Sequence, residues 1–186
     1  MGVALFLRVY INKCFGASAR NLVLVQYYLE GIKMKMAALS DYFESGLLNH
    51  VFRGGTFSKP SNISLALTSG VPLDSNTGQT IPEIPSGING SGTGYYRVDL
   101  GAPEDSTWSH LAADIASGIG TIRNSGQLVF RTALLDWGWV SGIAIVDHAT
   151  VGSGNLLMHA QLDNPRIIYT GDNAKFDAST LEISFK

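Results

Sequence analysis

Cysteine and long hydrophobic runs are scarce in this chain of 186 residues. Cys14 is the only cysteine, so a disulfide cannot form within the chain. The histidines and Cys14 do not have the spacing of a structural zinc site. We therefore expect a fold stabilised by packing, with no bound metal and no cofactor.

The apolar runs near the N-terminus are too short to cross a membrane. Arg8, Lys13 and Arg20 interrupt them before they reach the roughly 20 residues that a transmembrane helix requires. The apolar residues also precede the charges, which is the reverse of their order in a secretory signal. We expect no membrane partner.

The net charge of −2 hides an uneven distribution of charge. Residues 1–35 contain five Lys or Arg and a single acidic residue, Glu30, which leaves 8 basic and 14 acidic residues in the rest of the chain. An acidic domain repels the phosphates of nucleic acids. We expect no nucleic-acid partner.

We predict that residues 1–35 are a non-native or unstructured N-terminal extension and that residues 36–186 form a single β-rich domain. Glu30-Gly31 can be encoded as a bacterial ribosome-binding sequence shortly before the codon of Met34, and the composition changes abruptly at Met36. Translation would then begin at Met34 or Met36. A tryptic peptide from residues 9–29 of the natural protein would contradict this hypothesis.

One helix and several short strands are predicted beyond Met36. Ser40 is a suitable N-cap, Gly54 a suitable stop, and apolar residues recur between them at helical spacing. The amphipathic helix predicted over residues 40–53 would cover one end of a sheet or dock onto a neighbouring subunit. Its apolar residues are Phe43, Leu47, Leu48, Val51 and Phe52.

Alternation of apolar and polar residues in NISLALT, residues 62–68, predicts a strand with one buried face formed by Ile63, Leu65 and Leu67. Further strands are predicted at residues 95–100, 127–131, 139–146, 156–162, 166–169 and 180–185. Turns are predicted at residues 136–138, 152–155, 163–165 and 171–173. About seven short strands indicate an antiparallel β-sandwich or barrel-like domain with one short N-terminal helix.

Two segments interrupt this pattern. Residues 69–94 are rich in Gly, Ser, Thr, Pro and Asn, which predicts a long loop that is mobile or orders against a partner. Residues 103–120 are ambiguous, because residues 111–116 could form a helical turn, whereas Gly118 and Gly120 favour irregular structure.

Catalytic motifs are not found in the sequence. No nucleophile elbow accompanies the four histidines, His50, His110, His148 and His159. The spacing of the acidic residues Asp99, Glu104, Asp105 and Asp114 does not indicate the facing carboxylates of a glycosidase. We therefore expect a protein that is not an enzyme and has no catalytic residues.

Cofactor and metal motifs are also not found. Arg123 stands where a dinucleotide fingerprint beginning at Gly118 needs a glycine. The glycines of residues 90–94 lack the Lys-Ser/Thr pair of a phosphate-binding loop. The acidic residues Asp172, Asp177 and Glu182 do not match a calcium loop, and Asp172 is explained by a turn.

Three tryptophans leave sugar binding open, because an aromatic face can stack on carbohydrate. Trp137 and Trp139 would lie on the same face of a strand, where core packing or a subunit contact is the more common role. A carbohydrate-binding role would require these two residues and Trp108 to be exposed.

The last third of the chain contains a series of turn and strand motifs: Asp136-Trp137-Gly138, Gly142-Ile143-Ala144-Ile145, Asp147, Gly154-Asn155-Leu156-Leu157, Pro165, Gly171-Asp172, Phe176 and Leu181. In this order they resemble small virion proteins of tailed bacteriophages, described as tail-fibre-like or capsid decoration proteins. MAALSDYFESGLLNHVFRGG, NISLALT and Gly94-Tyr95-Tyr96-Arg97 share the resemblance, whereas residues 77–94 and 103–120 look expanded.

The resemblance implies a non-enzymatic virion protein, assembled in the cytoplasm of the bacterial host. It would be a capsid decoration (cement) protein or a tail-fibre-like accessory protein, with decoration slightly ahead because the chain is short and has no fibrous repeats. The implied partners are further copies of the chain, with a trimer as our expectation, and other virion proteins such as the major capsid protein or tail proteins. The alternative is a carbohydrate-binding module of a phage tail or capsid surface, with a host glycan as ligand.

Overall fold

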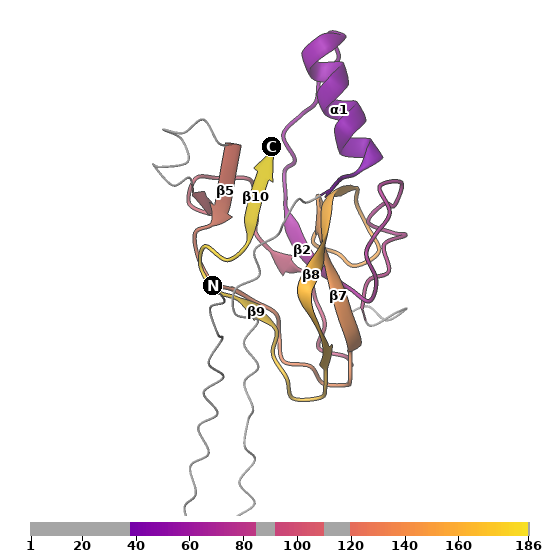
Figure 1. Cartoon of the computed structure of the whole chain (residues 1–186), viewed down its shortest axis with the longest axis vertical. Helices are drawn as coiled ribbons and strands as arrows, with labels where there is room; N and C mark the ends of the chain where they lie inside the picture. The colour runs from indigo at the N-terminus through magenta and orange to yellow at the C-terminus, as the bar shows by residue number, and fades with distance from the viewer. Residues whose placement is uncertain (1–37, 85–91, 110–119, 186) are drawn as a thin grey trace, which may run out of the picture.

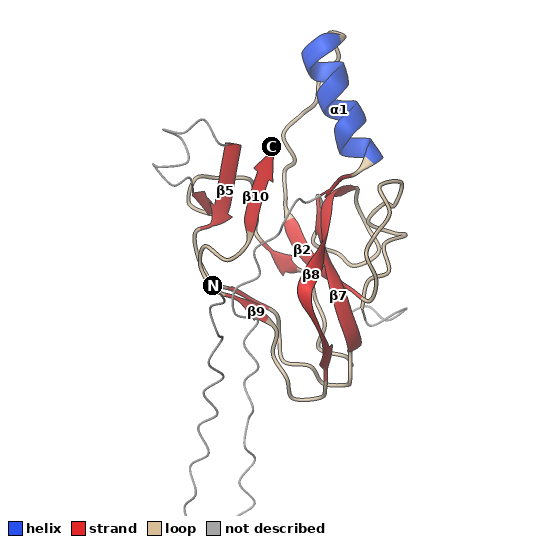
Figure 2. Ribbon diagram, viewed as in Figure 1, coloured by secondary structure: helices blue, strands red, loops and turns tan. Residues whose placement is uncertain are grey.

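The computed structural model describes residues 38–84, 92–109 and 120–185. These residues form antiparallel sheets and one helix, α1 (Figures 1 and 2). The elements are β1 Ala38–Leu39, α1 Asp41–Phe52, β2 Ser64–Thr68, β3 Val98–Asp99, β4 Trp108–Ser109, β5 Gly120–Asn124, β6 Leu128–Val129, β7 Gly138–Val146, β8 Leu156–Ile168, β9 Lys175–Phe176 and β10 Glu182–Phe185. This confirms the expected fold class, mainly β and antiparallel with one N-terminal helix.

The largest sheet has the strand order β1-β8-β7-β2-β3. Its centre is the pairing of β7 with β2 and β8, in which Ile143 lies opposite both Leu67 and Ala160. A second sheet has the order β10-β5-β4, and β6 pairs with β9. Figure 2 shows the β5–β10 pair standing beside the large sheet.

The main core lies between the large sheet and the two smaller ones. Leu65, Leu67, Ile143 and Ile145 project from β2 and β7 into one cluster. The smaller sheets and their connections contribute Leu128, Phe130, Phe176, Leu181 and Ile183. The small sheets therefore cover one face of the large sheet in a sandwich-like arrangement.

The other face of the large sheet is covered by the loop that follows β2. Ile81 packs there against Ala66, Ala144, Val146 and Leu156. As a result β2 is buried at all five positions, so the expectation that it has one buried face is wrong. Of the long loop predicted over residues 69–94, residues 69–84 are held against the sheet through the buried Ile81 and Ile84, although many of their other side chains are exposed. Residues 85–91 lie outside the described residues.

The predicted helix over residues 40–53 is confirmed. The Ser40 side chain caps it by accepting a 3.2 Å hydrogen bond from the Phe43 amide. Its last turn ends where Gly54 adopts a φ of +71° and the Gly55 amide donates to the Asn49 carbonyl at 3.0 Å.

The helix does not cover the end of a sheet as one reading of its apolar face predicted. None of its residues is buried, and Figure 1 shows it extending beyond the sheets. Phe43 alone among its side chains packs against the described core. Phe57 returns along the helix and contacts Tyr42 and Phe43, with ring centroids 6.0 and 5.5 Å apart.

The predicted turn at residues 163–165 is wrong, because β8 continues through it as one strand. The pairing of β7 with β8 shifts register here: Gly142 lies opposite Gln161 and Val140 opposite Arg166. Four residues of β8, 162–165, therefore face the single residue Ser141 of β7. Pro165 lies in this bulge, one of the few places where a sheet tolerates proline.

The strand predicted over residues 95–100 is reduced to β3. Tyr95 and Arg97 are buried, whereas Tyr96 is exposed. The strands predicted at residues 127–131, 139–146 and 180–185 correspond to β6, β7 and β10. No strand was predicted for β1, β4, β5 or β9, and the helical turn considered at residues 111–116 lies outside the described residues.

Candidate functional site

A cluster of exposed apolar side chains lies where β7 begins and β8 ends. We call it the Trp139 patch; it consists of Leu134, Leu135, Trp139, Ile167 and Tyr169, all of them exposed. Trp139 lies directly opposite Ile167 in the sheet, so both side chains are on one face. Tyr169 follows two residues after Ile167 and extends this face.

Backbone hydrogen bonds fix the support of the Trp139 patch. The Gly171 amide donates to the Ala133 carbonyl at 2.8 Å, and the Ala133 amide donates to the Asp172 carbonyl at 2.9 Å. Beside them, Thr170 donates from its amide and its hydroxyl to Asp136 Oδ1 at 2.7 and 2.9 Å. These two hydrogen bonds lower the pKa of the Asp136 carboxyl, because they stabilise its ionised form. Hydrogen bonds therefore hold the two backbone segments that carry the patch against each other.

The expectation that Trp137 and Trp139 share a face is wrong. Gly138, between them, has a φ of +82°, which breaks the alternation of a regular strand. Trp137 is buried, packs edge-on to Tyr95 and donates from its indole nitrogen to the Thr93 carbonyl at 2.8 Å. Trp139 remains 52% exposed.

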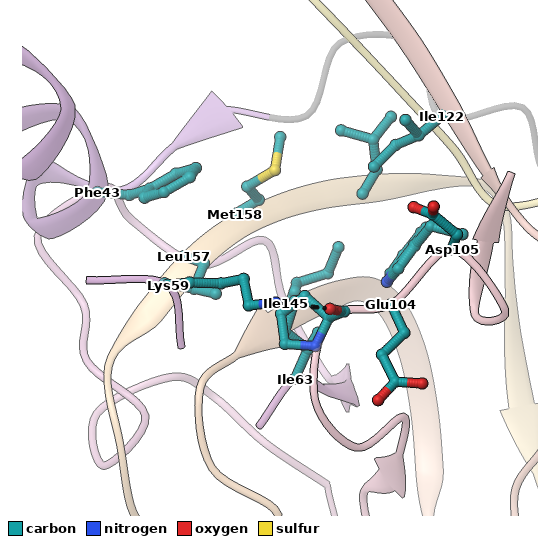
Figure 3. A pocket seen from close by; sticks show the side chains of 12 residues that line it. Phe43, Lys59, Ile63, Glu104, Asp105, Ile122, Ile145, Leu157 and Met158 are labelled. Carbon is teal, nitrogen blue, oxygen red and sulfur yellow. Dashed lines mark hydrogen bonds between the residues drawn. The ribbon is translucent and has the colours of Figure 1, made fainter. Parts of the chain in front are cut away.

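A pocket of about 450 Å³ opens between α1, β8 and the β10-β5-β4 sheet. Figure 3 shows apolar side chains from these elements converging on it. Lys59, Glu104 and Asp105 add charge to its lining, and Lys59 Nζ donates to the Pro103 carbonyl at 3.1 Å. The apolar lining comprises Phe43, Ile63, Pro103, Trp108, Ile122, Ile145, Leu157, Met158 and Ile183. Trp108 is thus a wall of this pocket and only half-buried.

A buried polar cluster joins three loops. Arg97 donates to both carboxylate oxygens of Glu83, with 2.7 Å between Nη2 and Oε2, and the Arg97 side chain is fully buried. It also donates to the carbonyls of Gly78, His148 and Ser153, each at 2.8 Å. Because all these acceptors belong to the chain itself, the cluster is a structural tie.

Tyr95 extends the same cluster into the core. Its hydroxyl donates to Glu83 Oε1 at 2.8 Å and accepts from the Leu67 amide at 3.0 Å. Burial raises the pKa of the Tyr95 phenol well above its usual value, and the nearby Glu83 carboxylate raises it further. The phenol therefore stays neutral.

The described histidines have separate hydrogen-bond partners. His50 and His148 accept hydrogen bonds from the amides of Phe57 and Thr150, and His159 Nε2 lies 2.9 Å from Asp74 Oδ1. His110 lies outside the described residues. Among the described histidines, none is hydrogen-bonded to a serine hydroxyl.

Within residues 38–84, 92–109 and 120–185, no three His, Cys, Asp or Glu side chains are grouped as metal ligands. The described helix is too short and too polar to cross a membrane. Asp114 and residues 90–91 lie outside the described part of the chain.

The pattern of exposed residues could have been found only in part from the sequence. The spacing of apolar residues in the sequence predicts the apolar face of α1. The sequence does not show that this face is exposed to solvent. The Trp139 patch unites two segments about 30 residues apart, and only the strand pairing brings them together.

Comparison with known proteins identifies the family. The search of curated proteins gives no match. Residues 38–184, most of the chain, match the family model described as Podophage GP4 fiber I protein gp80. The motifs quoted for the resemblance to tailed-phage virion proteins lie within this match, apart from Met36 and Ala37 at the start of the first motif. The chain therefore belongs to this podophage fibre family and is a fibre-like structural protein of a tailed-phage virion.

Proposed function

We propose that this chain is a non-enzymatic, self-associating subunit of a phage tail fibre, and that the Trp139 patch is buried against another virion subunit. We further propose that three copies associate and that assembly takes place in the host cytoplasm. The observation that carries the proposal is the exposure of five large apolar side chains where β7 begins and β8 ends.

The composition of the Trp139 patch is that of an interface centre. Trp and Tyr are enriched in the buried centres of protein interfaces and supply most of the binding energy there. Trp139, Ile167 and Tyr169 lie on strand ends and a hydrogen-bonded turn, so little conformational entropy is lost when they are covered. Large apolar side chains that are exposed on neighbouring segments favour a contact site.

A fibre role is preferred to capsid decoration because the family match names a fibre protein. The short length and the lack of repeats led the sequence analysis to favour decoration. A fibre can also contain compact accessory domains, and these need no repeats.

The test is to locate the chain on phage particles and to ask whether the patch is required. Electron microscopy with a gold-labelled antibody should place the chain on tail fibres. In particles complemented with Trp139→Asp, the label should fall to background, whereas Leu73→Asp, an exposed apolar residue outside the patch, should leave it unchanged. Label on the capsid would support decoration instead, and equal incorporation of both variants would contradict a role for the patch.

A second candidate is glycan binding by the same patch. The condition that all three tryptophans be exposed is not met, because Trp137 is buried and Trp108 is half-buried. Glycan binding is favoured by two exposed aromatic rings, Trp139 and Tyr169, next to the hydrogen-bonding groups of Asp136 and Thr170. Aromatic faces with adjacent polar groups suit sugar rings. Host surface saccharides should then quench tryptophan fluorescence in the natural chain and in Trp108→Phe, and not in Trp139→Phe. Quenching that persists in Trp139→Phe would exclude this candidate.

A further inference from the structure

The free end of α1 presents apolar side chains to solvent. Phe52 is 77% exposed, and Leu48 and Val51 beside it are 56% and 64% exposed. The helix is held at its other end by the Ser40 cap and by the packing of Phe57 against Phe43. Its tip projects from this attachment, and Figure 1 shows it well away from the sheets.

The pocket of Figure 3 is suited to receive such a projection. Its volume of about 450 Å³ is within the range of roughly 300–1,000 Å³ that is typical of ligand-sized cavities. Its lining includes the apolar side chains of Ile145 from β7 and Met158 from β8. An aromatic ring in an apolar pocket is the usual form of an interface hot spot.

The charges of Arg53 at the tip and of two carboxylates at the pocket are complementary. The pocket lining also contains Lys59, whose ammonium group is already engaged by the Pro103 carbonyl. Arg53 follows Phe52 directly and is exposed. Glu104 and Asp105 are exposed carboxylates in the pocket lining. In the described part of the chain, these three side chains form no salt bridge with one another or with other residues.

We propose that α1 of one copy inserts Phe52 into this pocket of a second copy and that Arg53 then pairs with Glu104 and Asp105. The inference rests on the proposed self-association and identifies the contact. A chain cannot fill its own pocket in this way, because Phe43 lines that pocket. Phe52 lies nine residues further along the same helix, about 14 Å away.

The contact joins two different surfaces, so it is a head-to-tail interface. Repetition closes a ring if the rotation between copies allows it and otherwise continues as a filament. Both results suit a fibre subunit, and a closed ring of three is the arrangement that agrees with the expected trimer.

The first test compares self-association by analytical ultracentrifugation of the full chain. Phe52→Ala should weaken association by about 30-fold or more, the loss expected for an interface hot spot. Leu73→Ala is the matched control, because Leu73 is 68% exposed and lies outside the pocket. Equal association of the two variants would overturn the proposal, as would a natural chain that is monomeric at all concentrations.

The second test uses charge reversal. Arg53→Glu alone, or Glu104→Arg with Asp105→Arg, should weaken association, and the triple variant should restore it because the charges are then complementary again. Circular dichroism confirms that each variant is folded. Failure of the triple variant to recover would overturn the pairing of Arg53 with these carboxylates.

The two proposals can fail separately. If Trp139→Asp abolishes self-association and Phe52→Ala does not, the helix-to-pocket contact is overturned while the proposed role of the Trp139 patch stands. If Phe52→Ala dissociates the protein and Trp139→Asp still enters the particle, the helix-to-pocket contact stands and the proposed use of the patch is overturned.

Discussion

Arg97 and Glu83 form a buried ion pair. The guanidinium of Arg97 donates to the Glu83 carboxylate and to three backbone carbonyls of the same chain. The pair connects the strand β3 region to the loop of residues 69–84, while the remaining donors of Arg97 reach the carbonyls of His148 and Ser153. It therefore ties the loop that covers β2 to the turn between β7 and β8.

Removing Arg97 should destabilise the fold strongly. Arg97→Met leaves the Glu83 carboxylate buried without its partner, which we expect to cost about 3–5 kcal/mol. Urea unfolding measures the change. Arg53→Met, at an exposed arginine, should change the stability by less than about 0.5 kcal/mol. Similar midpoints for the two variants would show that the ion pair is not needed.

Alkaline pH should destabilise the protein through Tyr95. Because the folded pKa of Tyr95 is raised, its contribution is fully present below the unfolded value of about 10. Above that pH the unfolded state loses a proton that the folded state keeps, so stability falls by up to about 1.4 kcal/mol per pH unit until the folded pKa is reached. Denaturant unfolding between pH 8 and 11 measures this slope.

Tyr95→Phe is the control for the alkaline effect. The variant should be less stable at pH 8, because Glu83 and the Leu67 amide lose a hydrogen-bond partner. Its stability should decline less steeply above pH 10 than that of the natural chain, since the other titrating groups are shared. If the stabilities of Tyr95→Phe and the natural chain fall equally steeply above pH 10, Tyr95 is not the source of the alkaline destabilisation.

Gly78 should not tolerate a side chain. An added Cβ would lie 2.2 Å from the Ser153 carbonyl oxygen, which belongs to the backbone and cannot rotate away. We expect Gly78→Ala to lose about 1–3 kcal/mol in thermal unfolding. Gly70, in the same loop, has open space around it, so Gly70→Ala should be neutral. Equal effects at both positions would mean that the loop does not pack on residue 153.

Trp137 and Trp139 should respond in opposite ways to truncation. Trp137→Ala removes a core ring and its hydrogen bond to Thr93, and we expect a loss of about 3–5 kcal/mol in unfolding experiments. Trp139→Ala should change the stability of the isolated chain by no more than about 0.5 kcal/mol while weakening its binding to other virion subunits. A large loss of stability in Trp139→Ala would indicate that its ring packs within the chain.

The sequence predicted the elements whose signals are local. Ser40 and Gly54 marked the ends of α1 correctly, and the apolar alternation placed β2 and β7. Burial on both faces of β2 could not be predicted, because Ile81 reaches it from the following loop. The two-residue strands β1, β3, β4, β6 and β9 have too few positions for a periodic pattern. Of these, β3 and β6 were expected only as parts of longer strands.

The features of the candidate interaction surfaces depend on contacts that are distant in sequence. Phe43, Trp108 and Met158 line one pocket, although they come from three separate elements. The turn predicted at residues 136–138 is wrong at Gly138, which is the first residue of β7. The positive φ of Gly138, which separates Trp137 from Trp139, could not be predicted from the sequence. The burial of Arg97 could not be predicted from the sequence. Most of its acceptors are backbone carbonyls, which no sequence motif identifies.

The irregular path of β8 also limits how copies of the chain can join. Among the described residues, the outer side of β8 pairs with β1 at Met158 and His159, and the Ser40 amide donates to the Leu157 carbonyl beside them. Pro165 removes one amide from the rest of that edge, and the bulge opposite Ser141 distorts it. Another strand would therefore find no regular hydrogen-bonding template there. Edge-to-edge pairing of copies is therefore disfavoured along this part of β8, and recognition there would depend on side chains, which can discriminate between partners.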